Sequence, residues 1–227
     1  MLELRELSKT YKTQNVVTTA MDRVSISMAR GEFVAVMGHS GCGTSTLLNL
    51  VGVLDSPSDG NYIFLDEDIS RYPESKLSHL RKKHIGFIFQ SFNLIDELTV
   101  SENIELALLY HSIPRAERRR RVDAIMDRVG VGHRRKHFPA QLSGGQQQRV
   151  AVARALVSEP ELILADEPTG NLDSAHGQEV MEMLRGLNDD GTSIMMVTHS
   201  TSHADYAKRT INLLDGRLVT ESLRAAI

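Results

Sequence analysis

The stretch GHSGCGTST, residues 38–46, lies between a short apolar run and a segment with helical character. The apolar run is EFVAVM, residues 32–37, and the helical segment is STLLNLV, residues 45–51. Strand, glycine-rich loop and helix in this order form a phosphate-binding loop, whose pattern is G-x-x-x-x-G-K-[ST]. This chain has Thr44 where the pattern has lysine. Taken alone, the stretch fits a nucleotide site without its main positive side chain and a plain strand-turn-helix equally well.

The composition indicates one globular domain. The chain has 227 residues, of which 41% are hydrophobic and 24% are charged, and this is ordinary for a protein with a substantial core. The net charge of -3 gives no overall attraction to nucleic acid. The single cysteine, Cys42, excludes an internal disulfide and indicates a reducing compartment. Since no stretch approaches the roughly 18 to 20 apolar residues that cross a bilayer, and the N-terminus has no apolar signal segment, we expect a cytoplasmic protein.

Two further apolar runs predict buried strands that end in polar residues. Residues 161–165 lead into Asp166 and Glu167, and residues 193–197 lead toward His199. Apolar strands separated by helical segments favour a parallel sheet, whose ligands bind at the carboxyl ends of the strands. We therefore expect the glycine-rich loop, the acid pair and His199 on one edge of the sheet.

These residue types suit a magnesium-nucleotide site. Glycines let backbone amides approach phosphates, and the following helix adds the partial positive charge of its N-terminus, so neither contribution needs the missing lysine. Ser45 is the hydroxyl expected on Mg²⁺, and Thr46 is expected near the α-phosphate. Asp166 is expected beside the metal, and Glu167 is expected to polarise the attacking water. A solvated acid pair at a strand end is the alternative, which the joint presence of both motifs disfavours.

The most specific stretch is LSGGQQQR, residues 142–149. Ser143, Gly144 and Gly145 precede a helical run over residues 146–157 and predict an N-cap with a second phosphate-facing helix start. With this motif the chain resembles the nucleotide-binding subunits of ATP-binding cassette (ABC) transporters, whose signature reads LSGGQ. The resemblance extends over nearly the whole chain.

The resemblance implies a role for residues far apart in the sequence. It implies that Tyr11 stacks on adenine, that Gln90 in FIFQ is the Q-loop glutamine, and that Asp173 in NLD belongs to the D-loop. The expected catalytic residues are Glu167, His199 and Gln90, and the expected metal ligands are Ser45, Gln90 and Asp166. The expected nucleotide-binding residues are Tyr11, Gly38, His39, Ser40, Gly41, Cys42, Gly43, Thr44, Ser45, Thr46, Ser143, Gly144, Gly145, Gln146 and Asp173.

The resemblance also implies a fold. It implies one α/β domain over residues 1–227, with a RecA-like P-loop core, an antiparallel β part and an inserted α-helical subdomain. Strand signals vanish in residues 92–158, where polar helical patterns cover 101–109 and 115–129, so we expect the helical subdomain there. Residues 1–91 and 159–227 are expected to form the core, and the N-terminal segment and residues 60–65 alternate like antiparallel strands.

Three stretches narrow the resemblance to the macrolide-exporter (MacB) and lipoprotein-releasing (LolD) branch. They are GFIFQ, PAQLSGGQQQR and ADEPTGNLDS, at residues 86–90, 139–149 and 165–174. That branch couples ATP to a membrane permease, and a chain without a membrane segment is similar to its stand-alone form, peripheral on the cytoplasmic face of the inner membrane. The family implies ATP and Mg²⁺ as cofactors and a head-to-tail homodimer, in which residues 143–145 of one copy close over the 38–46 loop of the other.

Thr44 bears on activity rather than on the kind of site. It keeps a hydroxyl but is too short and neutral to bring positive charge to the β- and γ-phosphates. Losing one preorganised donor reduces the rate about 10²- to 10³-fold, so we expect weakened binding and strongly impaired hydrolysis. We favour an isolated lysine-to-threonine change in an otherwise competent ATPase. The alternative is a nucleotide-gated regulatory subunit that binds ATP without turnover.

Other features have more ordinary interpretations. The basic runs at residues 115–121 and 133–137 fit a solvated helix face, with contact to anionic lipid headgroups beside a membrane partner as the alternative. Nucleic acid is not expected, because no aromatic residues interleave with them. The remaining histidines lack the spacing of a zinc site. Cys42 is expected to be a tolerated small residue, whose position beside a helix N-terminus predicts labelling by thiol reagents and protection by nucleotide.

Overall fold

A six-stranded sheet forms the centre of the molecule in the computed structural model, which describes residues 1–13 and 16–223. Its strands lie in the order β10 (Arg217–Leu223), β9 (Arg209–Leu214), β3 (Phe33–Met37), β8 (Ser193–Val197), β7 (Leu162–Asp166) and β6 (Ile85–Phe89). All are parallel except the edge strand β10. Since Met196 of β8 pairs with both Ala35 of β3 and Ala165 of β7, these strands end on one edge, as the sequence predicts.

Both faces of this sheet are covered. Side chains alternate between the faces of a strand, and in β7 Leu162 and Leu164 pack into one apolar cluster while Ile163 and Ala165 pack into another. The first cluster includes α1 (Thr44–Val51), and the second includes the helices on the opposite face. A strand buried on both sides has no polar face, which explains the continuous apolar run of β7.

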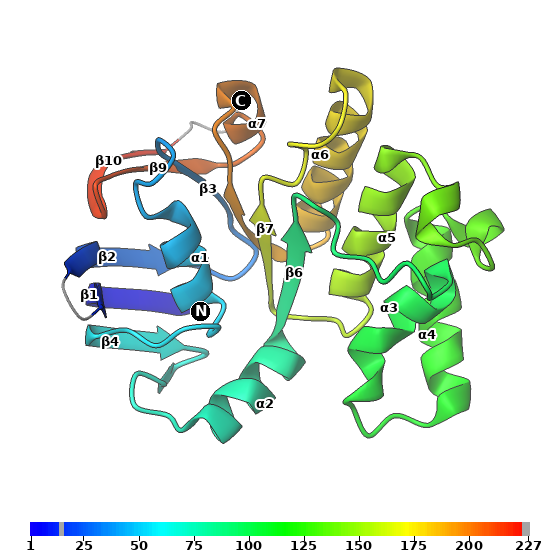
Figure 1. Ribbon diagram of the computed structural model, residues 1–227, viewed down its shortest axis with the longest axis horizontal. Coiled ribbons are helices and arrows are strands. Elements are labelled where there is room, and N and C mark those ends of the chain that lie inside the picture. The colour runs from blue at the N-terminus through cyan, green and yellow to red at the C-terminus, as the bar shows by residue number, and fades with distance from the viewer. Residues whose placement is uncertain (14–15, 224–227) are drawn as a thin grey trace.

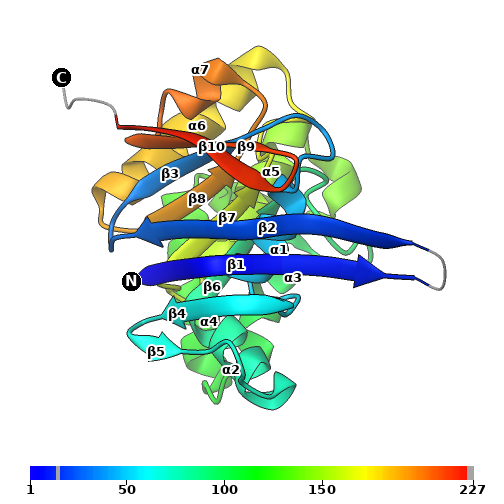
Figure 2. The ribbon, with the colours of Figure 1, turned by 90° about the vertical axis from the view of Figure 1, so that its left-hand side faces the viewer.

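A second, antiparallel sheet completes the core. It has four strands in the order β2 (Val17–Met28), β1 (Leu2–Lys12), β4 (Asp59–Phe64) and β5 (Glu67–Asp68). This sheet faces the viewer in Figure 2, and in Figure 1 α1 lies between it and the central strands. Leu47 and Leu50 of α1 are buried in the same cluster as Leu4 and Phe64 of the antiparallel sheet. The predicted antiparallel β part is confirmed.

A helical subdomain lies on the right-hand side of Figure 1. It contains α3 (Val100–Leu109), α4 (Arg115–Arg128), α5 (Gly144–Leu156) and short 3-10 turns at Gly132–Arg134 and Pro139–Gln141. The structure describes every residue from 92 to 158, and none of them lies in a strand. The predicted start of α5 at Gln146 is wrong by one half-turn, because Ser143 and Gln146 form a capping box that lets the helix begin at Gly144.

Several elements had no prediction of their own. They are the strands β5 and β6, the helices α2 (Glu74–His84) and α6 (Ser174–Asp189), the short α7 (Thr201–Ala204) and the β9–β10 hairpin. Only Leu77 of α2 is buried, so its apolar periodicity is weak. Within residues 1–13 and 16–223, no helix is both long enough and apolar enough to cross a membrane.

Candidate nucleotide site

The glycine-rich loop joins β3 to α1 through tightly packed backbone. Gly41 and Gly43 have φ of 82° and 104°, in the left-handed region that favours glycine. A Cβ at Gly43 would lie 2.7 Å from the carbonyl oxygen of Ala20. The amide of Leu47 donates to the Gly43 carbonyl at 2.8 Å, so α1 starts directly from the loop. Only glycine fits at position 43, and the free amides of the first helical turn face outward from it.

A cavity of about 310 Å³ opens beside this helix start. It is lined by Thr18, Thr19, Ala20, Gly41, Gly43, Thr44, Ser45, Thr46, Asp215 and Gly216. Thr44 is only 7% exposed, so its short side chain forms part of the wall. Of the predicted 38–46 stretch, the lining includes Gly41, Gly43, Thr44, Ser45 and Thr46.

Two walls of the cavity were not predicted. One is residues 18–20 of β2, and the other is the turn between β9 and β10. The Gly216 amide donates to the carbonyl of Cys42 at 2.8 Å, and the Asp22 amide donates to the carbonyl of Gly216 at 2.9 Å, so the turn fastens the loop to β2. The pair Asp215-Gly216 between apolar residues is a hairpin signal that sequence reasoning could have used.

The other predicted loop residues have different surroundings. His39 and Ser40 are exposed, whereas Cys42 is 3% exposed and belongs to the apolar cluster around α1. Its Sγ packs against Gly38, where no Cβ could be accommodated. The prediction that thiol reagents label Cys42 is therefore at odds with its burial. The tolerated small residue is the interpretation that fits.

Tyr11 lies near the end of β1, outside the residues that line the cavity. Its hydroxyl donates to Asp55 Oδ2 at 2.9 Å, and Lys9 Nζ lies 4.9 Å from the centre of the ring. Burial, followed by the bond to Asp55, raises the pKa of the Tyr11 phenol. The predicted stacking on adenine is not tested by this geometry.

Asp166, Glu167 and His199 meet at the carboxyl edge of the sheet, as their strand positions predict. Glu167 follows β7 with a left-handed φ of 45°, and its amide donates to the Val197 carbonyl at 3.0 Å. Its Oε1 accepts a bond from the His199 backbone amide at 2.7 Å and lies 3.6 Å from His199 Nε2. A left-handed non-glycine residue costs on the order of 1–3 kcal/mol and persists where its surroundings hold it. The bond to His199 supplies that support.

The residues present fit Mg²⁺. Burial raises the pKa of Asp166, and no hydrogen bond to its carboxylate is found in the part of the chain that the structure describes. Ser45 places a hydroxyl at the start of α1. Among residues 1–13 and 16–223, no cluster of three or more His, Cys, Asp or Glu could hold a metal, which is compatible with an ion bound by one carboxylate together with phosphate oxygens.

Gln90 lies against the loop that follows Glu167. Its Nε2 is 3.4 Å from Asn171 Oδ1, and its carbonyl accepts a bond from Asn171 Nδ2 at 3.0 Å. A Cβ at Gly170 would lie 2.6 Å from Gln90 Nε2, so this glycine makes room for the glutamine. Asn171, the first residue of the NLD stretch, is thus a partner of Gln90, a contact that the sequence does not show.

The signature stretch lies against the D-loop of the same chain. Ser143 Oγ caps α5 by accepting from the Gln146 amide at 3.3 Å. A Cβ at Gly145 would lie 2.7 Å from Cδ2 of His176, a residue that was not predicted. Asp173 caps α6, and its Oδ2 lies 2.7 Å from His176 Nδ1, which lowers the pKa of Asp173 and raises the pKa of His176.

The two helix starts that the sequence predicts to face phosphate do not meet within one chain. Figure 1 shows α1 beside the antiparallel sheet and α5 in the helical subdomain, with the central strands between them. Among the described residues that line the cavity, none comes from α5. The cavity therefore has an open side.

Comparison with known proteins decides the family. The family described as ABC transporter matches residues 21–170. The chain belongs to this family. It is 45% identical over 219 residues to an uncharacterized ABC transporter ATP-binding protein of Methanocaldococcus jannaschii, which covers 96% of this chain and 98% of that protein.

This ABC cassette is also similar to longer proteins. It is 44% identical over 226 residues to the macrolide export ATP-binding/permease protein MacB of Rhodospirillum rubrum. That match covers 100% of this chain but 35% of the relative, so the cassette spans about a third of its length.

Solved structures of ABC cassettes share the fold. The dimeric structure of a post-hydrolysis state of the ATP-binding cassette MJ0796, bound to ADP and Pi, superposes with a TM-score of 0.91 at 40% identity and covers 100% of both chains. The structure of cbiO1 from Clostridium perfringens, part of the complex cbiONQ, gives 0.87 at 30% identity over 98% of this chain and 88% of the other. The predicted fold class is confirmed, and the chain is an ATP-binding cassette of the ABC ATPase family.

Proposed function

We propose that this ABC cassette binds MgATP at the 38–46 loop and uses its hydrolysis to drive a separate membrane permease. One observation carries the proposal: the loop that leads to Thr44, the carboxylates of Asp166 and Glu167, and His199 all follow neighbouring parallel strands that end at one edge of the sheet. Phosphate binding, metal binding and water activation need these groups within one site.

Each of these residues has a distinct task in the proposed reaction. The amides at the start of α1 hold the phosphate chain, and Asp166 and Ser45 hold Mg²⁺, which when bound offsets negative charge on the phosphates. Glu167 accepts the proton of the attacking water, and its bond to the His199 amide at 2.7 Å orients the carboxylate for this. The imidazole of His199 is then placed to contact the γ-phosphate. Gln90 assists at the metal from the neighbouring loop.

A second copy of the chain would complete the site. Since none of the lining residues comes from α5, the signature residues 143–145 of one copy would close over the open side of the other copy's cavity. The dimeric structures of the similar cassette MJ0796 support this arrangement. Two identical copies would form two ATP sites at their interface.

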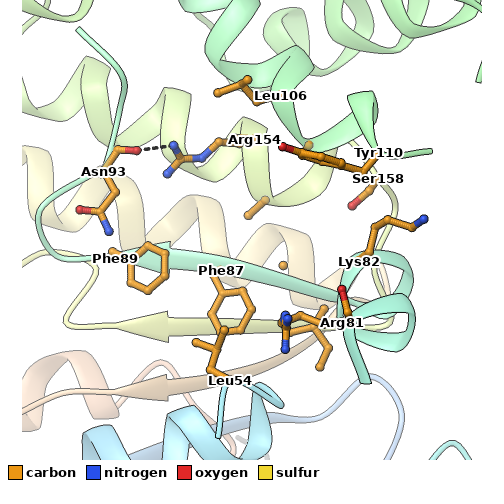
Figure 3. Close-up of a pocket in the computed structure, with 15 residues that line it drawn as sticks. Leu54, Arg81, Lys82, Phe87, Phe89, Asn93, Leu106, Tyr110, Arg154 and Ser158 are labelled. Atoms are coloured by element: carbon orange, nitrogen blue, oxygen red, sulfur yellow. Dashed lines mark hydrogen bonds between the residues drawn. The ribbon is translucent and has the colours of Figure 1, made fainter. Parts of the chain in front are cut away.

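A groove between the core and the helical subdomain supports the proposed partner. Figure 3 shows Phe87 and Phe89 of β6 facing it on one side and Tyr110 and Leu106 on the other. The groove has a volume of about 770 Å³, and the Tyr110 side chain is 76% exposed. A cytoplasmic segment of a MacB- or LolD-like permease would bind here. The cassette would then be peripheral on the cytoplasmic face of the membrane.

The basic runs contribute less to membrane contact than their sequence suggests. Arg118 is paired with Glu105, and Arg120 and Arg121 are paired with Glu117. Paired charges on one helix face fit the solvated-face interpretation. Contact with anionic lipid headgroups beside the permease stays a proposal, and nucleic acid is not proposed as a partner.

Thr44 is proposed to impair hydrolysis strongly and to weaken nucleotide binding without abolishing it. The side chain forms part of the cavity wall but carries no charge. The second candidate function, a regulatory subunit that binds ATP without turnover, rests on the same residue. Turnover by the unaltered chain at any measurable rate above background would favour the ATPase.

The proposed dimer with shared ATP sites can be tested by measuring molecular mass in solution. Glu167→Gln keeps the shape of the site but removes the proton acceptor, so at saturating MgATP this variant is expected to form a dimer. Adding Ser143→Glu places a negative charge against the partner's phosphates and should return it to a monomer. A monomer at every ATP concentration, with nucleotide bound, would contradict the shared site. Copurification with a membrane protein encoded beside this chain tests the permease role separately.

A further inference from the structure

Arg154 is a partly buried arginine in the last turn of α5, and its guanidinium donates to backbone carbonyls. Its Nη2 donates to the carbonyl of Phe92 at 2.7 Å, and its Nη1 donates to the carbonyl of Asn93. Burial lowers the pKa of the guanidinium, and no carboxylate pairs with it among residues 1–13 and 16–223. Figure 3 shows Arg154 reaching across the groove wall toward Asn93. A partly buried charge without a counter-ion depends on such hydrogen bonds to replace its lost hydration.

The two carbonyls belong to a strained turn. Phe92 and Asn93 have φ of 60° and 50°, so consecutive non-glycine residues occupy the left-handed region. For a bulky residue such as Phe92 this conformation is an outlier, and it persists only where the surroundings hold it. The turn's own hydrogen bonds run to Phe89 at 3.2 Å and Ser91 at 2.6 Å, and both lie inside the same segment. The contacts from Arg154 come from another element and can hold the turn in place.

The N-terminal end of α5 also contacts this turn. A Cβ at Gly144 would lie 3.8 Å from Cζ of Phe92, so the ring of Phe92 sits beside the start of α5. The helix therefore holds the turn through the ring at Gly144 and through the carbonyls at Arg154. Gln90 immediately precedes this turn and contacts Asn171 on its other side.

We propose that Arg154 is a positioning residue for Gln90. By holding the carbonyls of Phe92 and Asn93, it fixes the turn after Gln90 to α5, so that Gln90 moves together with the signature motif. A movement of the residues that line the groove would displace the Arg154 side chain and, through the turn, Gln90 at the nucleotide site. This effect on the nucleotide site rests on the proposed function, because it takes Gln90 as a group that serves the bound Mg²⁺.

The first experiment needs no nucleotide. Amide hydrogen exchange of the segment 90–94 is measured in Arg154→Met and in the matched control Arg149→Met. Arg149 lies on the same helix and also donates to a backbone carbonyl, that of Val129 at 3.1 Å, but it does not touch the turn. Because the lost bonds involve a charged donor, exchange of 90–94 should become about 10-fold faster in Arg154→Met and stay unchanged in the control. Equal exchange in all proteins overturns the proposal.

The second experiment compares the Kd for ATP with and without Mg²⁺. In Arg154→Met the gain in affinity from Mg²⁺ should fall about 10-fold, as for other residues that orient a metal ligand, while the Kd without Mg²⁺ stays unchanged. The link to Gln90 would be refuted if exchange of the turn became faster in Arg154→Met while the gain in ATP affinity from Mg²⁺ stayed unchanged. If the parent protein binds no ATP at all, the proposed function fails, and the exchange experiment still decides whether Arg154 holds the turn. If Arg154→Met does not fold, Arg154→Lys keeps the charge but reaches one carbonyl, and its exchange should be intermediate.

Discussion

Replacing Thr44 by lysine should change the stability of this ABC cassette in opposite directions with and without nucleotide. Position 44 is the first residue of α1 and is only 7% exposed, so the new ammonium would enter a confined helix N-terminus. A cation there opposes the partial positive charge of the helix end, which costs roughly 0.3–1 kcal/mol at exposed sites and up to about 2 kcal/mol at partly buried ones. We therefore expect Thr44→Lys to lower the free energy of unfolding by about 1–2 kcal/mol without nucleotide.

The phosphates of ATP reverse the sign of this change in the free energy of unfolding. They place negative charge where the ammonium lies, so Thr44→Lys should bind MgATP more tightly and gain more stability from it than the parent does. In a domain of 227 residues, 1 kcal/mol shifts the Tm by roughly 2–4 °C. The Tm of Thr44→Lys should thus be about 2–8 °C below that of the parent without nucleotide and above that of the parent with MgATP. The rate of phosphate release should rise about 10²- to 10³-fold, since a preorganised donor contributes roughly 2.7–4 kcal/mol to the transition state.

Two assays and one control test this reasoning. Thermal unfolding is recorded with and without MgATP, and phosphate release is measured on the same preparations. Thr44→Met matches lysine in length but has no charge, so it should show neither the reversal nor the gain in rate. The reasoning is refuted if Thr44→Lys folds and binds ATP but hydrolyses it no faster than the parent. An equal gain in Thr44→Met would refute the electrostatic cause.

Three further predictions concern helices α5 and α6. A Cβ at Gly186, inside α6, meets no atom within 4 Å, so Gly186→Ala should raise the free energy of unfolding by about 0.5–1 kcal/mol in urea titrations, and a decrease would contradict the geometry. Gly145→Ala should lower the free energy of unfolding by roughly 1–3 kcal/mol, because the new methyl meets the ring of His176 at 2.7 Å. Adding His176→Ala to the same chain should restore part of this loss. Asp173 raises the pKa of His176 above 6.5, so the stabilising pair is fully present below about pH 6.5 and is lost as pH rises through the higher folded value. The Tm difference between the parent and His176→Gln should accordingly shrink between pH 6 and pH 8.5, and a difference that does not vary with pH would refute this assignment.

The sequence alone identified the main parts of the fold and the stretches proposed to form the site, because those parts are local. The loop 38–46, the acid pair at the end of β7 and His199 at the end of β8 each follow an apolar run, and parallel strands bring such endings to one edge. The capping box at Ser143 is also local, although its effect on the start of α5 was underestimated.

The contacts that shape the site beyond these stretches depend on tertiary structure. No local pattern could show that the side chain of Cys42 turns into the core, or that Ala20 and Gly216 form walls against the loop. Arg154 likewise appears in the sequence as an ordinary helical residue, and only the packing of α5 against the turn after Gln90 gives it two carbonyl partners. Motifs encode what a short segment can do, whereas burial and long-range hydrogen bonds depend on which segments the folded chain brings together. The sequence thus determined that this is an ABC cassette with threonine at the lysine position, and the tertiary structure decided which side chains contact the loops around the proposed nucleotide site.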